Sequence, residues 1–143
     1  MKECCSGAGV VWHLVDKTMD VQKQIEYWRE GARRDLAAAR SLLETRHPDH
    51  ALFFAHLALE KMLKAHVSKA TQHVPPKIHN LARLAEIAGL SVSEEELNAL
   101  RRFDKHQIEG RYPDAMKVPS NMRIARSELT WAAKTVSRLR RKL

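Results

Sequence analysis

The sequence contains little cysteine, glycine or proline, and these shortages narrow the fold class. Its only two cysteines, Cys4 and Cys5, are adjacent, so no disulfide framework is implied. Glycine and proline number five each among 143 residues. Alanine, leucine, arginine, lysine and glutamate recur throughout instead, and these residues lose little rotamer freedom in a helix. We therefore expect an all-α protein, and its length suits a single domain.

Long apolar runs are also missing. The one apolar piece near the start, residues 7–12, has Glu3 before it and His13 and Asp16 after it. It is too short, and too polar at its flanks, for a membrane span or a signal peptide. This predicts a cytoplasmic protein with no membrane contact. Regular periodicity begins only near residue 19, so we expect residues 1–18 to form a poorly structured N-terminal extension.

No metal-binding pattern links the eight histidines. They lack cysteines or carboxylates at convincing ligand spacing, so we expect no metal and no cofactor. His56 lies on or beside the apolar side of its predicted helix. We interpret it as a satisfied core or interface histidine in preference to a catalytic one.

Apolar spacing predicts three longer helices. Residues 19–45 and 49–68 each carry an apolar stripe, and Pro48 breaks the chain between them because proline cannot continue the helical hydrogen bonds. Ser120 can cap a last helix with a narrow apolar seam spaced by three and four residues. Such a seam suits packing within a bundle or pairing across a dimer.

Local end signals predict two further helices between these. A short helix begins at His79 or Asn80 and ends at Gly89, a favourable left-handed residue. Ser93 and Glu96 form a capping box that starts the next helix. The predicted fold is an up-and-down bundle of four to five helices over residues 19–143.

Positive charge is concentrated late in the chain. The formal net charge is +8, and residues 120–143 contain seven lysines or arginines but only one acid, Glu128. Such a face can collect phosphates, because neutralising them releases condensed counterions. On charge alone, however, the solvated side of an amphipathic helix is the favoured interpretation.

We expect the functional site in residues 101–114, where a helical pattern gives way to glycine and proline. Two arginines and a histidine stand close together there. Arg102 and His106, four residues apart, share one face of a helix. Arg101 and His106 point about 140° apart in a regular helix, so they meet only if the helix unwinds near Gly110 or if two copies meet across a dimer axis.

Three segments carry a resemblance to a known family. The first is FAHLALEKMLKA at residues 54–65. The second is Pro75 followed by IHNL at 78–81, and the third joins DKH at 104–106 to RYPDA at 111–115. In this order and separation, the chain resembles the HEPN domain family over about Val21 to Leu139.

The resemblance implies a helical bundle that usually dimerises and is often encoded beside a small nucleotidyltransferase, as one half of a toxin–antitoxin pair. Many members are metal-independent endoribonucleases whose motif is an arginine followed, after four to six residues, by a histidine. Arg101 and His106 match this motif and are implied as the catalytic pair. The histidine would move the proton of the ribose 2′-hydroxyl or of the leaving oxygen, while the arginine stabilises the phosphorane charge.

Other residues are candidates for holding RNA or a nucleotide. Arg102, Lys105 and Arg111 would contact phosphates, together with the basic last helix. Tyr112 most readily fixes a turn, with stacking on a base as a second role. Lys64 is expected mainly to pair with Glu60, four residues away, with a place in a nucleotide pocket as the alternative.

The chain departs from the family pattern at one position. Members paired with a nucleotidyltransferase often have a tyrosine two residues after the histidine, and Ile108 stands there in this chain. Two functions therefore stay open: an endoribonuclease toxin, or a non-catalytic nucleotide- or substrate-binding subunit that partners a nucleotidyltransferase. A third alternative is that Arg101, Asp104 and His106 form only surface pairs.

Overall fold

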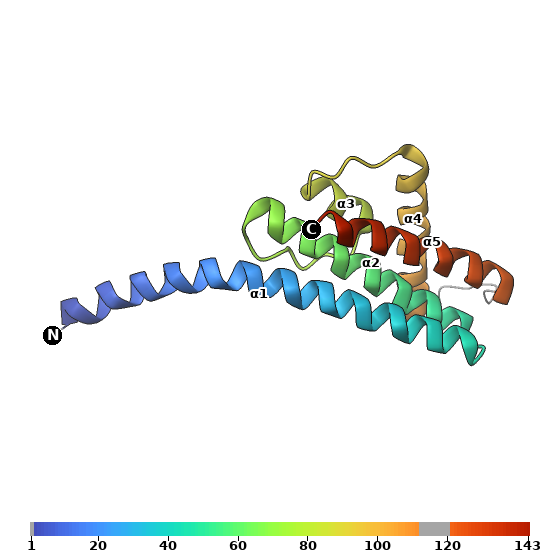
Figure 1. The fold of residues 1–143 in the computed structure, drawn as a ribbon, viewed down its shortest axis with the longest axis horizontal. Helices are drawn as coiled ribbons and strands as arrows, with labels where there is room; N and C mark the ends of the chain where they lie inside the picture. Colours follow the sequence, from blue (N-terminus) through green and yellow to red (C-terminus); the bar gives the residue numbers. More distant parts are fainter. Residues whose placement is uncertain (1, 112–120) are drawn as a thin grey trace.

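The part of the chain that the structure describes forms five helices. This computed structural model describes the backbone of residues 2–111 and 121–143, and the side chains of residues 21–108 and 121–143. Its helices are α1 Lys2–Glu44, α2 Pro48–Thr71, α3 Leu81–Ile87, α4 Glu94–Arg111 and α5 Met122–Arg141 (Figure 1). The described residues include no strand, which confirms the predicted all-α bundle.

Helices α1 and α2 form an antiparallel hairpin, with Arg46 in a left-handed conformation (φ 64°) at the turn and Pro48 in the first turn of α2. Helix α1 begins at Lys2, whereas the apolar periodicity predicted a start near residue 19. Figure 1 shows the N-terminal half of α1 extending past the other helices. The prediction that residues 1–18 form a poorly structured N-terminal extension remains a prediction, because their side chains lie outside the described part.

Helix α2 lies at the centre of the molecule. It contacts all four other helices, and its side chains from Ala51 to Ser68 are mostly buried. This agrees with its many apolar residues, which predict a central position. The three remaining long helices therefore pack around α2 as the common core element.

Helix α5 runs parallel to α2 and antiparallel to α1 (Figure 1). Its predicted seam is buried within the bundle, at Ala125, Leu129, Ala132, Val136 and Leu139. Near its end, His66 Nε2 donates a hydrogen bond to the Leu139 carbonyl at 2.8 Å, and Lys69 Nζ donates to the carbonyls of Lys142 and Leu143 at 2.9 and 3.0 Å. The bonds from Lys69 supply donors to carbonyls just past the end of α5, and the bond from His66 adds a second donor to the Leu139 carbonyl, which also accepts from the Lys142 amide.

The start of α5 differs by one residue from the prediction. Asn121, not Ser120, is the N-cap, and its Oδ1 accepts a hydrogen bond from the Ile124 amide at 2.8 Å. Serine and asparagine are equally good caps, so the sequence alone does not choose between neighbours.

The end signals of α3 and α4 are confirmed. Asn80 Oδ1 accepts from the Arg83 amide at 2.8 Å, and Gly89 (φ 67°) ends α3. The Gly89 and Leu90 amides donate to the carbonyls of Glu86 and Ala85, which is a Schellman motif. In the capping box, the Glu96 amide donates to Ser93 Oγ at 3.1 Å, while the Ser93 amide donates to Glu96 Oε2 at 3.2 Å.

Helix α4 crosses α2 steeply (Figure 1) and is anchored by one aromatic side chain. Phe103 is fully buried, and its ring stacks on Trp131 of α5 with centroids 5.7 Å apart. Because Phe103 fixes the rotation of α4, it also fixes which α4 side chains face outward. None of the helices, over the residues described, is long and apolar enough to cross a membrane.

Candidate functional site

Helix α4 distributes the predicted site residues around its circumference. Arg101, Arg102 and Lys105 are exposed, whereas His106 is partly buried and lies edge-on to Phe103 with ring centroids 5.4 Å apart. Arg102 donates to Glu128 Oε1 of α5 at 3.1 Å. The side chains of α4 thus face three surroundings: the core, α5 and solvent.

The helix end does not resolve the spacing conflict between Arg101 and His106. Helix α4 continues through His106 as far as Arg111, so the chain is not unwound at the histidine. A separation of five residues then leaves the two side chains about 140° apart around the axis. A single chain therefore places the two predicted catalytic residues on different faces of α4.

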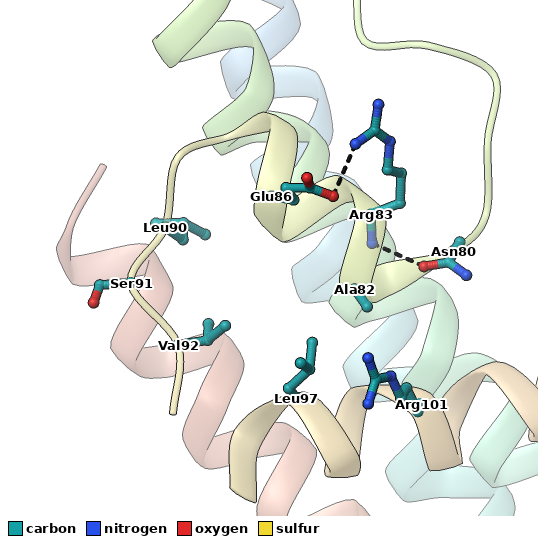
Figure 2. Close-up of a pocket in the computed structure, with 9 residues that line it drawn as sticks. All are labelled: Asn80, Ala82, Arg83, Glu86, Leu90, Ser91, Val92, Leu97 and Arg101. Carbon is teal, nitrogen blue, oxygen red and sulfur yellow. Dashed lines mark hydrogen bonds and ion pairs between the residues drawn. The ribbon is translucent and has the colours of Figure 1, made fainter. Parts of the chain in front are cut away.

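Arg101 lines a pocket between α3 and α4 (Figure 2). The pocket has a volume of about 590 Å³, which falls in the range of about 300–1,000 Å³ typical of small-molecule sites. In Figure 2, Arg101 and Leu97 of α4 face the residues of α3 and its cap. The lining residues are Asn80, Ala82, Arg83, Glu86, Leu90, Ser91, Val92, Leu97 and Arg101.

The pocket combines two guanidinium groups with an apolar wall. Arg83 is paired, since its guanidinium donates to Glu86 Oε2 at 2.8 Å. Arg101 has no carboxylate of its own among the residues that line the pocket, because Glu86 is already engaged. The arrangement can therefore take an anionic group at Arg101 and an apolar or planar group beside Leu90, Val92 and Leu97.

A largely buried polar network links the helices beside this pocket. Glu60 Oε1 accepts hydrogen bonds from Lys64 Nζ at 2.9 Å and from His79 Nδ1 at 3.0 Å. Asp104 Oδ1 accepts from His56 Nε2 and from the Leu81 amide, each at 3.1 Å. The network joins α2, the start of α3 and α4, and so it holds the two sides of the pocket in register.

The two halves of the network approach each other at His56. Its Nδ1 lies 3.8 Å from Glu60 Oε2, too far for a hydrogen bond, and neither atom has another partner among the described residues. His56 is fully buried and hydrogen-bonded through Nε2 alone, so its position agrees with a core histidine although Nδ1 has no partner among the described residues. Lys64 is 6% exposed, pairs with Glu60 as expected and lies 5.2 Å from the Trp28 ring centroid, so it does not line the Arg101 pocket.

Comparison with known proteins identifies the family. A model of the HEPN domain matches residues 25–142. The chain belongs to the HEPN domain family. This confirms the resemblance carried by the three sequence segments.

Two solved structures have a similar fold. The protein TT1696 from Thermus thermophilus is 29% identical, with a TM-score of 0.72, and the match covers 84% of this chain and 98% of that protein. ST0689, an archaeal HEPN homologue, is 22% identical with a TM-score of 0.64, and the match covers 82% of this chain and 96% of that one. At the latter identity the likeness shows the fold alone. No curated protein matches the chain.

The sequence did not predict the contacts of two residues of this HEPN domain. Arg83 was not expected to join Arg101, although its position three residues after the Asn80 cap places it in the first turn of α3. Asp104 was expected at most to form a surface pair with Arg101. It instead accepts hydrogen bonds from His56 and the Leu81 amide. A usable signal was that Asp104, His56 and Leu81 each belong to a different one of the three segments that carry the family resemblance.

Two predicted contacts of the HEPN domain are not described. Arg111 ends α4, but its side chain lies outside the described residues, as does Tyr112.

Lys105 is exposed one helical turn from Arg101 and adds positive charge to the same side of α4. Among the described residues, no group of three His, Cys, Asp or Glu side chains is arranged to hold a metal ion.

Proposed function

We propose that this HEPN domain binds RNA, and that Arg101 contacts a phosphate in the pocket between α3 and α4. The observation that carries the proposal is the position of Arg101, exposed at a pocket where Glu86, the one carboxylate among the described lining residues, is already paired with Arg83. A guanidinium offers a fork of donors that matches two phosphate oxygens. Lys105, one turn further along α4, extends the positive surface for a second phosphate.

The same pocket also suits a single nucleotide. Its volume and its apolar wall of Leu90, Val92 and Leu97 accommodate a base or ribose while Arg101 holds the phosphate. In this variant of the proposal, the chain is a non-catalytic nucleotide- or substrate-binding subunit that acts with a small nucleotidyltransferase. RNA and mononucleotide share the phosphate chemistry, and they are separated by experiment.

Binding is tested by fluorescence anisotropy with a labelled single-stranded RNA, and with labelled ATP in parallel. We expect Arg101→Gln to weaken binding about tenfold or more, because a charge-assisted contact is worth about 1.5–3 kcal/mol. Arg34→Gln is the control, since Arg34 is an exposed arginine on α1, paired with Glu30 at 3.4 Å, that lines no pocket described above. Tight binding of ATP but not RNA would select the nucleotide-binding subunit, and equal binding by both variants would contradict a role for Arg101.

A second candidate function is metal-independent RNA cleavage as the toxin of a toxin–antitoxin pair. The motif of Arg101 and His106 favours it, although the two residues lie on different faces of α4 in one chain. In a homodimer, Arg101 of one copy and His106 of the other would complete a site. His106 would move the proton of the 2′-hydroxyl, and Arg101 would stabilise the phosphorane.

Complementation distinguishes a shared site from a site within one chain. His106→Ala and Arg101→Ala are each expected to abolish EDTA-resistant cleavage. If two copies share the site, an equal mixture of the two variants, refolded together, should recover about one quarter of the wild-type activity. About half of the dimers are then heterodimers, and each heterodimer has one intact site of its two. No cleavage by the folded wild-type protein would remove the nuclease and leave the binding function.

A further inference from the structure

A second cationic surface lies between α1 and α5, away from the Arg101 pocket. Two adjoining pockets of about 230 and 400 Å³ share Arg40 and Ala133, and so form one groove along the two helices. Neither pocket has a residue in common with the pocket between α3 and α4. We call this surface the α1–α5 groove, and its basic residues are Arg29, Arg33, Arg40, Arg126, Lys134 and Arg140.

The groove has a large excess of positive charge. None of the described residues that line it carries a carboxylate. Two of its arginines are neutralised by neighbours on α1: Arg29 pairs with Glu26 at 3.5 Å, and Arg33 pairs with Glu30 at 2.6 Å. The other four cations are exposed and have no ion pair within the described part of the chain, namely Arg40, Arg126, Lys134 and Arg140.

These cations follow the length of the groove. Arg140 lies with Arg29 and Arg33 at one end of the groove, and Arg126 lies with Arg40 at the other. This order follows from the antiparallel course of α1 and α5. At 1.5 Å per residue, Arg126 and Arg140 are about 21 Å apart along α5. The groove therefore presents a row of unpaired cations, whereas the pocket between α3 and α4 presents one, Arg101.

The chemistry of the groove selects its occupant. A second copy of the chain is disfavoured, because an isologous contact would bring the same unpaired cations against each other. Base stacking is also disfavoured, because the lining residues that the structure describes include no aromatic side chain. An extended polyanion, by contrast, meets successive cations and releases its counterions.

We propose that the α1–α5 groove binds the sugar–phosphate backbone of RNA without reading its sequence, in addition to the contact at Arg101. This rests on the proposed function, in that the ligand is RNA. Arg40 and Arg126 at one end, with Lys134 and Arg140 beyond them, each contact a phosphate. The Arg101 pocket then holds a different part of the same RNA.

The salt dependence of binding tests the groove directly. The variant Arg40→Gln/Arg126→Gln/Arg140→Gln is compared with Lys23→Gln/Arg34→Gln/Lys77→Gln, which removes equal charge from exposed positions outside the groove. Affinity for a single-stranded RNA is measured over a salt series, and for a second RNA of unrelated sequence. Circular dichroism confirms that both variants are folded.

The groove variant should bind each RNA about tenfold or more weakly at low salt, and its slope of log affinity against log salt should be shallower by about 2, or about 0.7 for each lost phosphate contact. Its loss should be the same for both sequences. The control should keep the wild-type slope.

Equal slopes for the groove variant and the control would overturn the groove proposal. If Arg101→Gln still weakened binding, the proposed function would stand without the groove. Absence of RNA binding by the wild-type protein at low salt would overturn both. Binding of an acidic helical peptide, abolished in the groove variant while RNA binding is unchanged, would assign the groove to a protein partner instead and contradict the proposal.

Discussion

The inward and outward faces of α4 differ in what determines their residues. The inward face carries Phe103 and Asp104, which are held by Trp131, His56 and the Leu81 amide. The outward face carries Arg101 and Lys105, which are exposed. A single helix thus separates residues expected to stabilise the fold from residues proposed to bind RNA, because inward substitutions break buried contacts while outward ones change only surface charge.

The largest loss of stability is expected for Phe103→Ala. Removing a fully buried phenyl ring leaves a cavity against Trp131, and such changes cost about 3–5 kcal/mol. Urea unfolding followed by circular dichroism measures the difference. Ile108→Ala is the matched control on the same helix, because Ile108 is 52% exposed, and it should change stability by no more than about 0.5 kcal/mol. Similar losses in both variants would contradict the described orientation of α4.

The next largest loss is expected for Asp104→Ala. The change leaves the His56 Nε2 proton and the Leu81 amide without an acceptor, at about 1–3 kcal/mol for each unsatisfied group. Asp104→Asn retains one carbonyl oxygen at this position, so it should be less destabilising than alanine. If asparagine and alanine were equally destabilising, the hydrogen bonds of Asp104 would contribute nothing beyond packing.

The distance along the chain between interacting groups decides which features the sequence predicted. Helix ends were predictable at Asn80, Gly89 and Ser93, because each end depends on hydrogen bonds within a few residues. The partners of Asp104 were not predictable from spacing, since His56 is 48 residues away and Leu81 is 23 residues away. Only the crossing of α4 over α2 brings these groups together.

The candidate site likewise has one part that the sequence indicated and one part that it did not. The choice of Arg101 as a site residue came from the family motif, and its exposure follows from the burial of Phe103 two residues later. Its pocket depends on the packing of α3 against α4, which no local signal contains. Sequence reasoning therefore indicated the residue but not its neighbour Arg83.

A smaller, pH-dependent effect is expected at Glu96, which joins the start of α4 to Arg138 of α5. The hydrogen bond from Arg138 holds the pKa of the Glu96 carboxyl below its usual value of 4.5. A lowered folded-state pKa means that the stabilisation is complete above about pH 5 and is lost as the pH falls through the folded pKa. Unfolding free energies from about pH 3 to 7 should fall less steeply at the acid end in Glu96→Gln than in the wild type. Parallel curves would show that the pair does not contribute to acid stability.

The smallest effect is expected for Arg102→Gln, and it separates the two neighbouring arginines of α4. Arg102 is already paired with Glu128, at 3.1 Å and with the arginine 52% exposed, so the pair contributes about 0.2–1 kcal/mol to stability. An RNA phosphate would have to compete with that carboxylate, whereas Arg101 meets no such competitor. In RNA-binding titrations, Arg102→Gln should therefore weaken affinity less than Arg101→Gln does. The reverse order would mean that RNA displaces Glu128, and that the face shared by Arg102 and His106 is the one that contacts the ligand.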